Sequence, residues 1–386
     1  MSISRARAAS LALAIAGVIA CLIMWRLDPR EFFLSYLFAF LFWLGIALGS
    51  AGWLMIHHLT GGKWGYPARR FFEAAISTLP VLALLFLPIV FAGAQLYPWA
   101  DPELVSADEL LRHKAAYLTG SAFLIRAVVL FAIWIVGARL LGKWSREQDA
   151  TSSVEPTKKL RRLSGPGLIV YPVTVTFAYV DWVMSMEADW SSTVFPLLVC
   201  IGQMLSALAF SILLIAWQRR RKPLAQILTP ENFHHLGNLL LTFTMLWAYL
   251  AYSQLIVIWS ADLPHEIGWY SHRIAGAWRW IAVALLLFHF FAPFCFLLFR
   301  PIKRNPQFLF GIAALIFVAH IVDLWWMLAP SIHQGGFHVS SMAPAAFIAI
   351  GGIWLTIWFR SLAAKPLIPL NDPRFAVAVA PGNLTA

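Results

Sequence analysis

The sequence FFLSYLFAFLFWLGIALGSAGWLMI, residues 32–56, decides the fold class because it runs for 25 residues without a charged side chain. About 20 apolar residues are enough for an α-helix to cross the hydrocarbon core of a bilayer, where a helix satisfies its own backbone hydrogen bonds. The whole chain has this character: 60% of its 386 residues are hydrophobic, 12% are charged, and the mean hydropathy is +0.73. Soluble domains carry about 25% charged residues, so most of this chain is predicted to lie in lipid.

Nine further apolar stretches predict an all-α integral membrane protein with about ten transmembrane helices. The first begins with basic residues as a signal peptide does, but no convincing cleavage site precedes Trp25, so we expect this span to be retained. Residues 1–386 are treated as a single polytopic membrane domain, because no segment between spans is long enough to fold by itself. The predicted spans are 8–25, 32–56, 74–97, 117–141, 168–186, 194–217, 236–259, 274–299, 308–328 and 342–359.

The net charge of +11 comes from basic clusters between the spans rather than from one continuous basic surface, which argues against nucleic-acid binding. Cytoplasmic segments of membrane proteins are enriched in Lys and Arg. Placing both termini in the cytoplasm puts the basic clusters inside, as expected for a multi-pass protein of a bacterial inner membrane. The cytoplasmic side then includes a loop over 139–167 and a tail over 360–386. The other inside clusters are Lys63 with Arg69 and Arg70, Arg219–Lys222, and Arg300 with Lys303 and Arg304.

An internal repeat divides the spans into two groups. Span 5 contains Val180-Asp181-Trp182 and span 9 contains Val322-Asp323-Leu324-Trp325, and each aspartate lies five residues before the predicted end of its span. Four spans separate this pair, so the two repeats run in the same direction. We therefore expect two parallel four-helix bundles, residues 32–186 (spans 2–5) and 194–328 (spans 6–9), flanked by spans 1 and 10.

Five ionisable residues, Arg126, Asp181, His289, His320 and Asp323, are predicted to lie within the spans. Each is a candidate functional residue, because a charge inside hydrocarbon costs at least about 2.5 kcal/mol unless it is paired or solvated. Arg126 and Asp181 could form a structural ion pair. Alternatively, the acidic groups could accept protons from a quinol, with the neighbouring basic groups tuning them. Both interpretations stay open, with Asp323 beside His320 favoured as the proton carrier and Asp181 as the structural partner of Arg126.

Span 7 carries Asn238, Thr242, Tyr249 and Ser253 nearly on one helical face. Together with His289 of span 8, these residues are a candidate proton path. The other interpretation is structural, because hydroxyl groups on transmembrane helices commonly bond to their own backbone or to a neighbouring helix.

The cysteines give no indication of a metal centre. Cys21, Cys200 and Cys295 stand singly in apolar stretches, and the sequence contains no CxxC or CxxCH motif. We therefore expect no metal ion and no covalently bound cofactor on this chain.

Six segments occur in order along spans 2 to 9 and carry a resemblance. They are Leu34–Ile56 followed by His57-His58-Leu59-Thr60-Gly61-Gly62, Leu96-Tyr97-Pro98-Trp99-Ala100, Lys114–Arg126, Asp181-Trp182-Val183-Met184-Ser185, Gly237–Tyr249 with Trp259-Ser260, and Arg304-Asn305-Pro306. Together these segments resemble the NrfD-like, polysulfide-reductase-like membrane subunits of bacterial alternative complex III, and within them the ActF group.

The resemblance implies a membrane subunit of a quinol:cytochrome c oxidoreductase that supports quinol oxidation and proton transfer in a respiratory or photosynthetic electron-transport chain. It implies an NrfD-like sister subunit, an iron–sulfur subunit and c-type cytochrome subunits as partners, and these would carry the haem and iron–sulfur centres. The substrate would be a quinol such as menaquinol, and no activity is expected from the chain alone.

Two other functions stay open beside this one. The His-plus-Asp quinol pocket of the wider family has no residue-by-residue match here, so the chain could be a structural and proton-channel subunit of the same complex without a quinone site. An independent transporter is a further alternative, although the repeat is parallel rather than inverted.

Overall fold

The computed structural model describes residues 3–151, 153–187, 189–333, 338–369 and 371–374. Ten of its helical stretches are long and apolar enough to cross a membrane. No β-strand occurs among the described residues. The prediction of an all-α, multi-pass membrane protein is therefore confirmed.

Each span consists of one helix or of several consecutive helical segments. The spans are α1 (Ile3–Leu27); α2 (Pro29–Thr60); α3 (Gly65–Ile76), α4 (Leu79–Leu85) and α5 (Leu87–Ala92) with η1 (Gly93–Gln95); α8 (Gly120–Ala150); α9 (Glu155–Trp182) with η3 (Met184–Met186); α10 (Phe195–Gln218); α12 (Pro230–Ala261); α14 (Trp278–Leu285), the π-helical turn η4 (Leu286–Phe291) and α15 (Ala292–Leu298); α17 (Pro306–Leu328) with η5 (Ala329–Ser331); and α18 (Ala343–Ala363). The connecting helices are η2 (Pro98–Ala100), α6 (Pro102–Ala107), α7 (Glu109–Lys114), α11 (Leu224–Ile227), α13 (Pro264–Ile274) and α16 (Arg300–Arg304).

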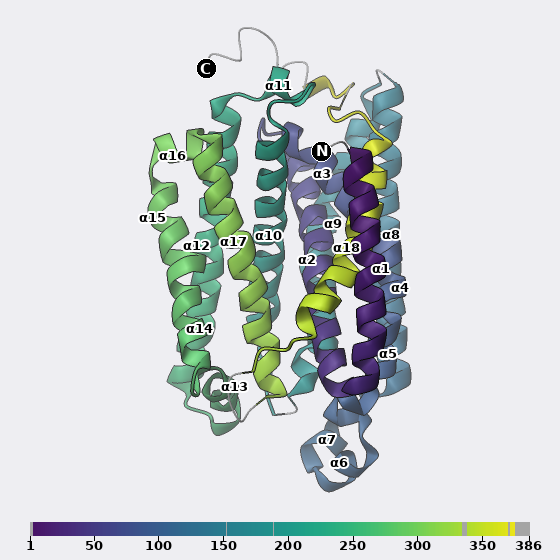
Figure 1. Ribbon diagram of the computed structural model, residues 1–386, viewed down its shortest axis with the longest axis vertical. Helices are drawn as coiled ribbons and strands as arrows, with labels where there is room; N and C mark the ends of the chain where they lie inside the picture. Colours follow the sequence, from purple (N-terminus) through teal and green to yellow (C-terminus); the bar gives the residue numbers. More distant parts are fainter. Residues whose placement is uncertain (1–2, 152, 188, 334–337, 370, 375–386) are drawn as a thin grey trace.

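The long helices stand side by side, and the connecting helices gather at the two ends of the molecule (Figure 1). We call the end at which α1 begins the N-terminal face; α11 and α16 lie there too. The other end, with α6, α7 and α13, is called the opposite face.

Helix α2 is the central helix of the molecule, and its most hydrophobic stretch is completely buried. It packs against α3, α9, α10 and α18. Its contact with α10 is especially close, because a Cβ atom at Gly49 would overlap the backbone carbonyl of Gln203. Small residues allow this kind of close helix packing in membranes. The two predicted groups of spans therefore meet along α2 and α10.

Most of the remaining contacts join helices within one of the two predicted groups, or join spans 1 and 10. In the first group, α2 packs on α3 and α9, and α8 packs on α4 and α9. In the second group, α10 packs on α12 and α17, and α17 also contacts α14 and η4. Spans 1 and 10 pack against each other beside α2, through small residues that bring Gly17 onto the backbone of Ala349 and Gly352 onto that of Ala14.

The predicted cytoplasmic loop over 139–167 is wrong in its extent. Helix α8 continues to Ala150 and α9 already begins at Glu155, so most of the predicted loop is helical. The predicted 360–386 tail is also structured in part, because α18 runs to Ala363 and Asp372 is buried; residues 375–386 lie outside the described part. Hydropathy shows where an apolar stretch ends. A helix can continue beyond that point, because polar residues with a high helix propensity also favour the helical conformation.

Arg69 and Arg70, grouped above with the cytoplasmic basic clusters, are buried in an ion-pair network near the N-terminal face. Arg69 donates to Glu73 at 2.9 Å and to Asp372 at 3.0 Å, and Arg70 donates to Glu73 at 2.7 Å. Lys365 lies 2.9 Å from the same Glu73 carboxylate. The network joins α3 to the residues that follow α18.

Arg273 of α13 fixes the end of α17 at the opposite face. Its guanidinium donates to the backbone carbonyl of Met327 at 2.6 Å, to Ser331 at 2.8 Å and to Glu187 at 2.9 Å. Burial lowers the pKa of the Arg273 guanidinium, whereas the Glu187 carboxylate raises it. This tether lies one helical turn beyond Asp323 and therefore helps to position the candidate site.

Candidate functional site

The fold brings three of the predicted site residues together within the second group of spans. His320 and Asp323 lie one turn apart on α17, and His289 faces them from the π-helical turn η4. Nδ1 of His320 lies 3.8 Å from Oδ2 of Asp323, and Nδ1 of His289 lies 4.0 Å from the same oxygen. All three residues are buried, with exposed fractions of 6% or less.

The position of His289 follows from its local sequence. Pro293, four residues later, has no backbone N–H with which to bond to the carbonyl of His289, and the helix widens into a π-turn just before it. The imidazole packs against Trp247 of α12, with ring centroids 4.1 Å apart and the ring planes tilted by 50°. Such π-turns occur frequently at functional sites. Trp247 was not among the residues that the sequence analysis identified.

Most polar atoms of this cluster lack a well-formed hydrogen bond, although the Trp247 indole lies close enough to the Asp323 carboxylate to interact with it. Both ring nitrogens of His289, Nδ1 of His320, Oδ2 of Asp323 and Nε1 of Trp247 are buried and have no hydrogen-bond partner among the described residues. Leaving a buried polar atom unpaired costs about 1–3 kcal/mol. An arrangement with several such atoms around one carboxylate therefore indicates a place for water or for a mobile proton.

A small cavity adjoins the cluster and supplies the space for a water molecule. It has a volume of about 10 Å³ and is lined by His320, Asp323, Gly202, Gln203 and Tyr179 among others. That volume holds about one water. A Cβ atom at Gly202 would lie 2.9 Å from Cε1 of His320, so a larger residue there would displace the imidazole.

From this cavity, hydrogen-bonded side chains continue toward the first group of spans. The Gln203 amide donates to the Tyr179 hydroxyl at 3.5 Å, and the Tyr171 hydroxyl donates to Oε1 of Gln203 at 2.9 Å. All three side chains are buried. The sequence analysis missed them, because it considered only ionisable groups and span 7. An uncharged Gln in the apolar stretch of span 6 was the available indication.

The ionisable residues of the first group, Arg126 and Asp181, form a direct pair. Nε of Arg126 donates to Oδ2 of Asp181 at 2.6 Å, and Nη1 donates to the carbonyl of Tyr117 at 3.0 Å. Asp181 is fully buried, while the Arg126 side chain is 20% exposed. The structure does not bring this pair into contact with Asp323 or its histidines, and its geometry favours a structural role.

Replacing Asp181 with Asn is expected to lower the stability of the protein by about 1–3 kcal/mol, because it leaves the Arg126 guanidinium without its charged partner. The melting temperature of the purified chain in detergent measures this effect. The matched control is Asp189→Asn, since Asp189 is exposed. Equal melting temperatures for the Asp181 and Asp189 variants would show that the pair does not support the fold.

The predicted path along span 7 is not enclosed by this chain. Thr242 and Tyr249 are exposed on the outer side of α12, Asn238 and Ser253 are half-buried, and the Thr242 hydroxyl bonds to the backbone carbonyl of Asn238 at 2.9 Å. His289 instead packs on Trp247, which belongs to the buried side of α12. The shared helical face was predicted from spacing, but spacing does not tell which neighbours cover that face.

A second, larger cavity lies between α2, α4, α8 and α9. Its volume is about 470 Å³, and its lining is almost entirely apolar, with Tyr171 and Thr174 as its polar residues. Drug-sized ligands occupy cavities of about 300–1,000 Å³, so the size suits an acyl or isoprenoid chain. The cavity contains no carboxylate and no imidazole.

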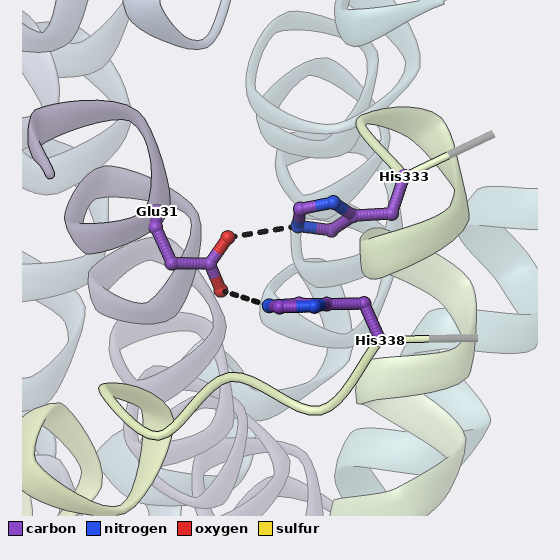
Figure 2. A group of neighbouring side chains, drawn as sticks. All are labelled: Glu31, His333 and His338. Atoms are coloured by element: carbon purple, nitrogen blue, oxygen red, sulfur yellow. Dashed lines mark hydrogen bonds and ion pairs between the residues drawn. The ribbon is translucent and has the colours of Figure 1, made fainter. Parts of the chain in front are cut away.

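Three further residues with metal-binding side chains converge at the opposite face, as Figure 2 shows. The two oxygens of Glu31, at the start of α2, point to His333 and His338 in the segment between η5 and α18. The single cysteines gave no indication of this cluster, and the available signal in the sequence was the His-x₄-His spacing of His333 and His338.

No protein-family model matches this chain, and no curated protein is significantly similar to it. The resemblance to NrfD-like subunits therefore stays a prediction from the six sequence segments. The function of the protein is therefore inferred from the arrangement of the residues described above.

Proposed function

We propose that this chain is a membrane subunit of a quinol:electron-acceptor oxidoreductase, with cytochrome c as the acceptor, and that it transfers protons through its second group of spans. The observation that supports this proposal best is the buried group of His289, His320 and Asp323 beside a cavity with room for about one water. Buried acidic and histidine residues in membrane proteins commonly serve as proton relays.

The distances suit a relay that uses water. Separations of 3.8 and 4.0 Å between the histidine nitrogens and Asp323 are too long for direct hydrogen bonds. One water in the cavity that His320 and Asp323 line can bridge these two residues at hydrogen-bond length. A proton can then pass between the Asp323 carboxylate and His320, and the Tyr179 hydroxyl on the same cavity wall, held by the Gln203 amide, can continue the path.

The same geometry argues against quinol oxidation at Asp323 itself. A cavity of about 10 Å³ cannot hold a quinol ring, and the larger cavity of about 470 Å³ offers no proton-accepting carboxylate or imidazole. Of these two cavities, one therefore has the space and the other has the proton acceptors. This separation favours the interpretation that the chain conducts protons while the quinol reacts elsewhere in the complex.

The proposed partners follow from the resemblance: an NrfD-like sister subunit, an iron–sulfur subunit and c-type cytochrome subunits in a bacterial inner membrane. Both termini would face the cytoplasm, since most basic residues belong to segments at the N-terminal face. The opposite face would then be periplasmic, and Asp323 lies on the half of α17 nearer to that face.

Affinity purification of the tagged chain from native membranes tests this assignment. We expect c-type haem subunits to be recovered with it, and the preparation to reduce cytochrome c with a quinol as the electron donor. The same tag on an unrelated ten-span transporter serves as the control. Recovery of the chain without any redox subunit, in a detergent that preserves other respiratory complexes, would contradict the assignment.

A further inference from the structure

We propose that Glu31, His333 and His338 form a zinc-binding site at the opposite face of the molecule. The proposal is independent of the redox function proposed above. Oε2 of Glu31 lies 2.8 Å from Nε2 of His333, and Oε1 lies 3.4 Å from Nε2 of His338. The three ligand atoms all lie within 4.8 Å of one another. Figure 2 shows both imidazoles directed at the same carboxylate.

The two separations from Glu31, 2.8 and 3.4 Å, are close to those around a tetrahedral zinc ion. Zinc binds histidine nitrogen and carboxylate oxygen at about 2.0–2.1 Å, which places neighbouring ligand atoms about 3.3 Å apart. The spacing of His333 and His338, with four residues between them, also lies in the range seen in zinc sites. Two histidines and one glutamate form a three-residue ligand set that leaves the fourth position to water.

The Glu31 carboxylate provides a second, independent observation. Glu31 is only 8% exposed, and its Oε1 atom has no hydrogen-bond partner among the described residues. A buried carboxylate oxygen without a donor is costly. A cation bound between the carboxylate and the two imidazoles removes that cost, because it coordinates the unpaired oxygen directly.

Contacts outside the site hold the two histidines in place. The backbone N–H of His333 donates to the carbonyl of Ala329 at 2.9 Å, and Nε1 of Trp325 donates to the carbonyl of His338 at 3.3 Å. Beyond His338, the hydroxyl groups of Ser340 and Ser35 are hydrogen-bonded at 2.9 Å. These contacts tie His333 to η5 and His338 to α17, which reduces the cost of positioning the two ligands on binding.

The chemistry of the ligands favours zinc over the hard cations of the cell envelope. Imidazole suits Zn²⁺, whereas Mg²⁺ and Ca²⁺ prefer sites made of oxygen atoms alone. The His338 side chain is 45% exposed, so the ion can enter from solvent and retain a water ligand. A bound zinc would join His333 and His338 to Glu31 in the first turn of α2.

Titration of the metal-free, full-length protein with ZnCl₂ in an isothermal calorimeter tests this site. We expect one Zn²⁺ to bind per chain and MgCl₂ to give no binding heat. His333→Ala and His338→Ala should abolish this binding event, and Glu31→Gln should weaken it at least about 10-fold. The control is His113→Ala on α7, an exposed histidine at the same face, which should leave binding unchanged.

The variants are compared only after their melting temperatures without metal have been shown to match that of the parent chain. His338→Ala is the safest of them, because its side chain is largely exposed. Failure of the parent chain to bind Zn²⁺ would overturn the proposal. Binding that survives in both histidine variants would also overturn it, because the zinc would then sit on other surface groups.

Discussion

Replacing Glu73 with Gln is expected to destabilise the folded protein by about 3–5 kcal/mol, the range measured when one partner of a buried ion pair is removed. Glu73 is 3% exposed and accepts hydrogen bonds from Arg69, Arg70 and Lys365. The amide of Gln keeps the shape of the side chain but removes its negative charge. The buried guanidinium groups of Arg69 and Arg70 would then have less negative charge nearby to balance their positive charges.

The network also explains why this effect should spread through the fold. Ser145 of α8 donates to Oε1 of Glu73 at 2.6 Å, and Arg69 bridges to Asp372. Loss of the Glu73 charge therefore loosens α3 from α8 and from the residues that follow α18. These contacts lie at the N-terminal face, far along the molecule from Asp323, so a stability defect here need not change proton transfer.

Thermal unfolding in detergent, followed by loss of the soluble monomer peak, measures the change. The matched control is Glu155→Gln, which removes an exposed partner of Lys158 and should leave the melting temperature unchanged. If the Glu73 and Glu155 variants melt at the same temperature as the parent chain, the buried network does not support the fold.

The sequence alone was sufficient for the ten spans, because hydrophobic length is a direct requirement of the bilayer. It also identified Asp323, His320 and His289, since ionisable groups are rare in apolar stretches. The ends of the helices were predicted poorly: α8 and α9 extend well beyond the apolar residues of their spans. Hydropathy does not predict how far a helix extends beyond its apolar residues.

The sequence alone could not predict contacts between residues that are far apart in the chain. Glu31 meets His333 and His338 across about three hundred residues, and Gln203 links Tyr171 to Tyr179 only because α9 and α10 pack together. Likewise, the hydroxyl row on span 7 could be placed on one helical face, but whether that face is buried depends on its neighbours. Arg69 shows the same limit, because its burial depends on Asp372.

Replacing Asp323 with Asn is expected to lower quinol-driven turnover of the complex by about 10²-fold, the lower end of the range for losing an acid–base group. Asn has the same shape as Asp but cannot take up and release a proton. Because Asp323 lies between His289 and His320, the variant removes the group that both histidines approach. Assembly should be preserved, since no arginine or lysine of the described residues pairs with Asp323 and would be left without a partner.

The control for this variant is Asp181→Asn, which removes the other aspartate of the repeat. Asp181 is engaged by Arg126, so its loss should reduce the amount of assembled complex rather than the turnover of each complex that forms. The two aspartates should therefore give opposite patterns when turnover is normalised to the amount of complex.

The measurement that tests the account most directly is proton release per electron from the complex in sealed vesicles, with the parent chain and with Asp323→Asn. We predict that the variant complex assembles in the normal amount and loses both proton release and turnover. Normal assembly with the parent rate of turnover and the parent yield of protons would contradict the proposal that this chain transfers protons through Asp323.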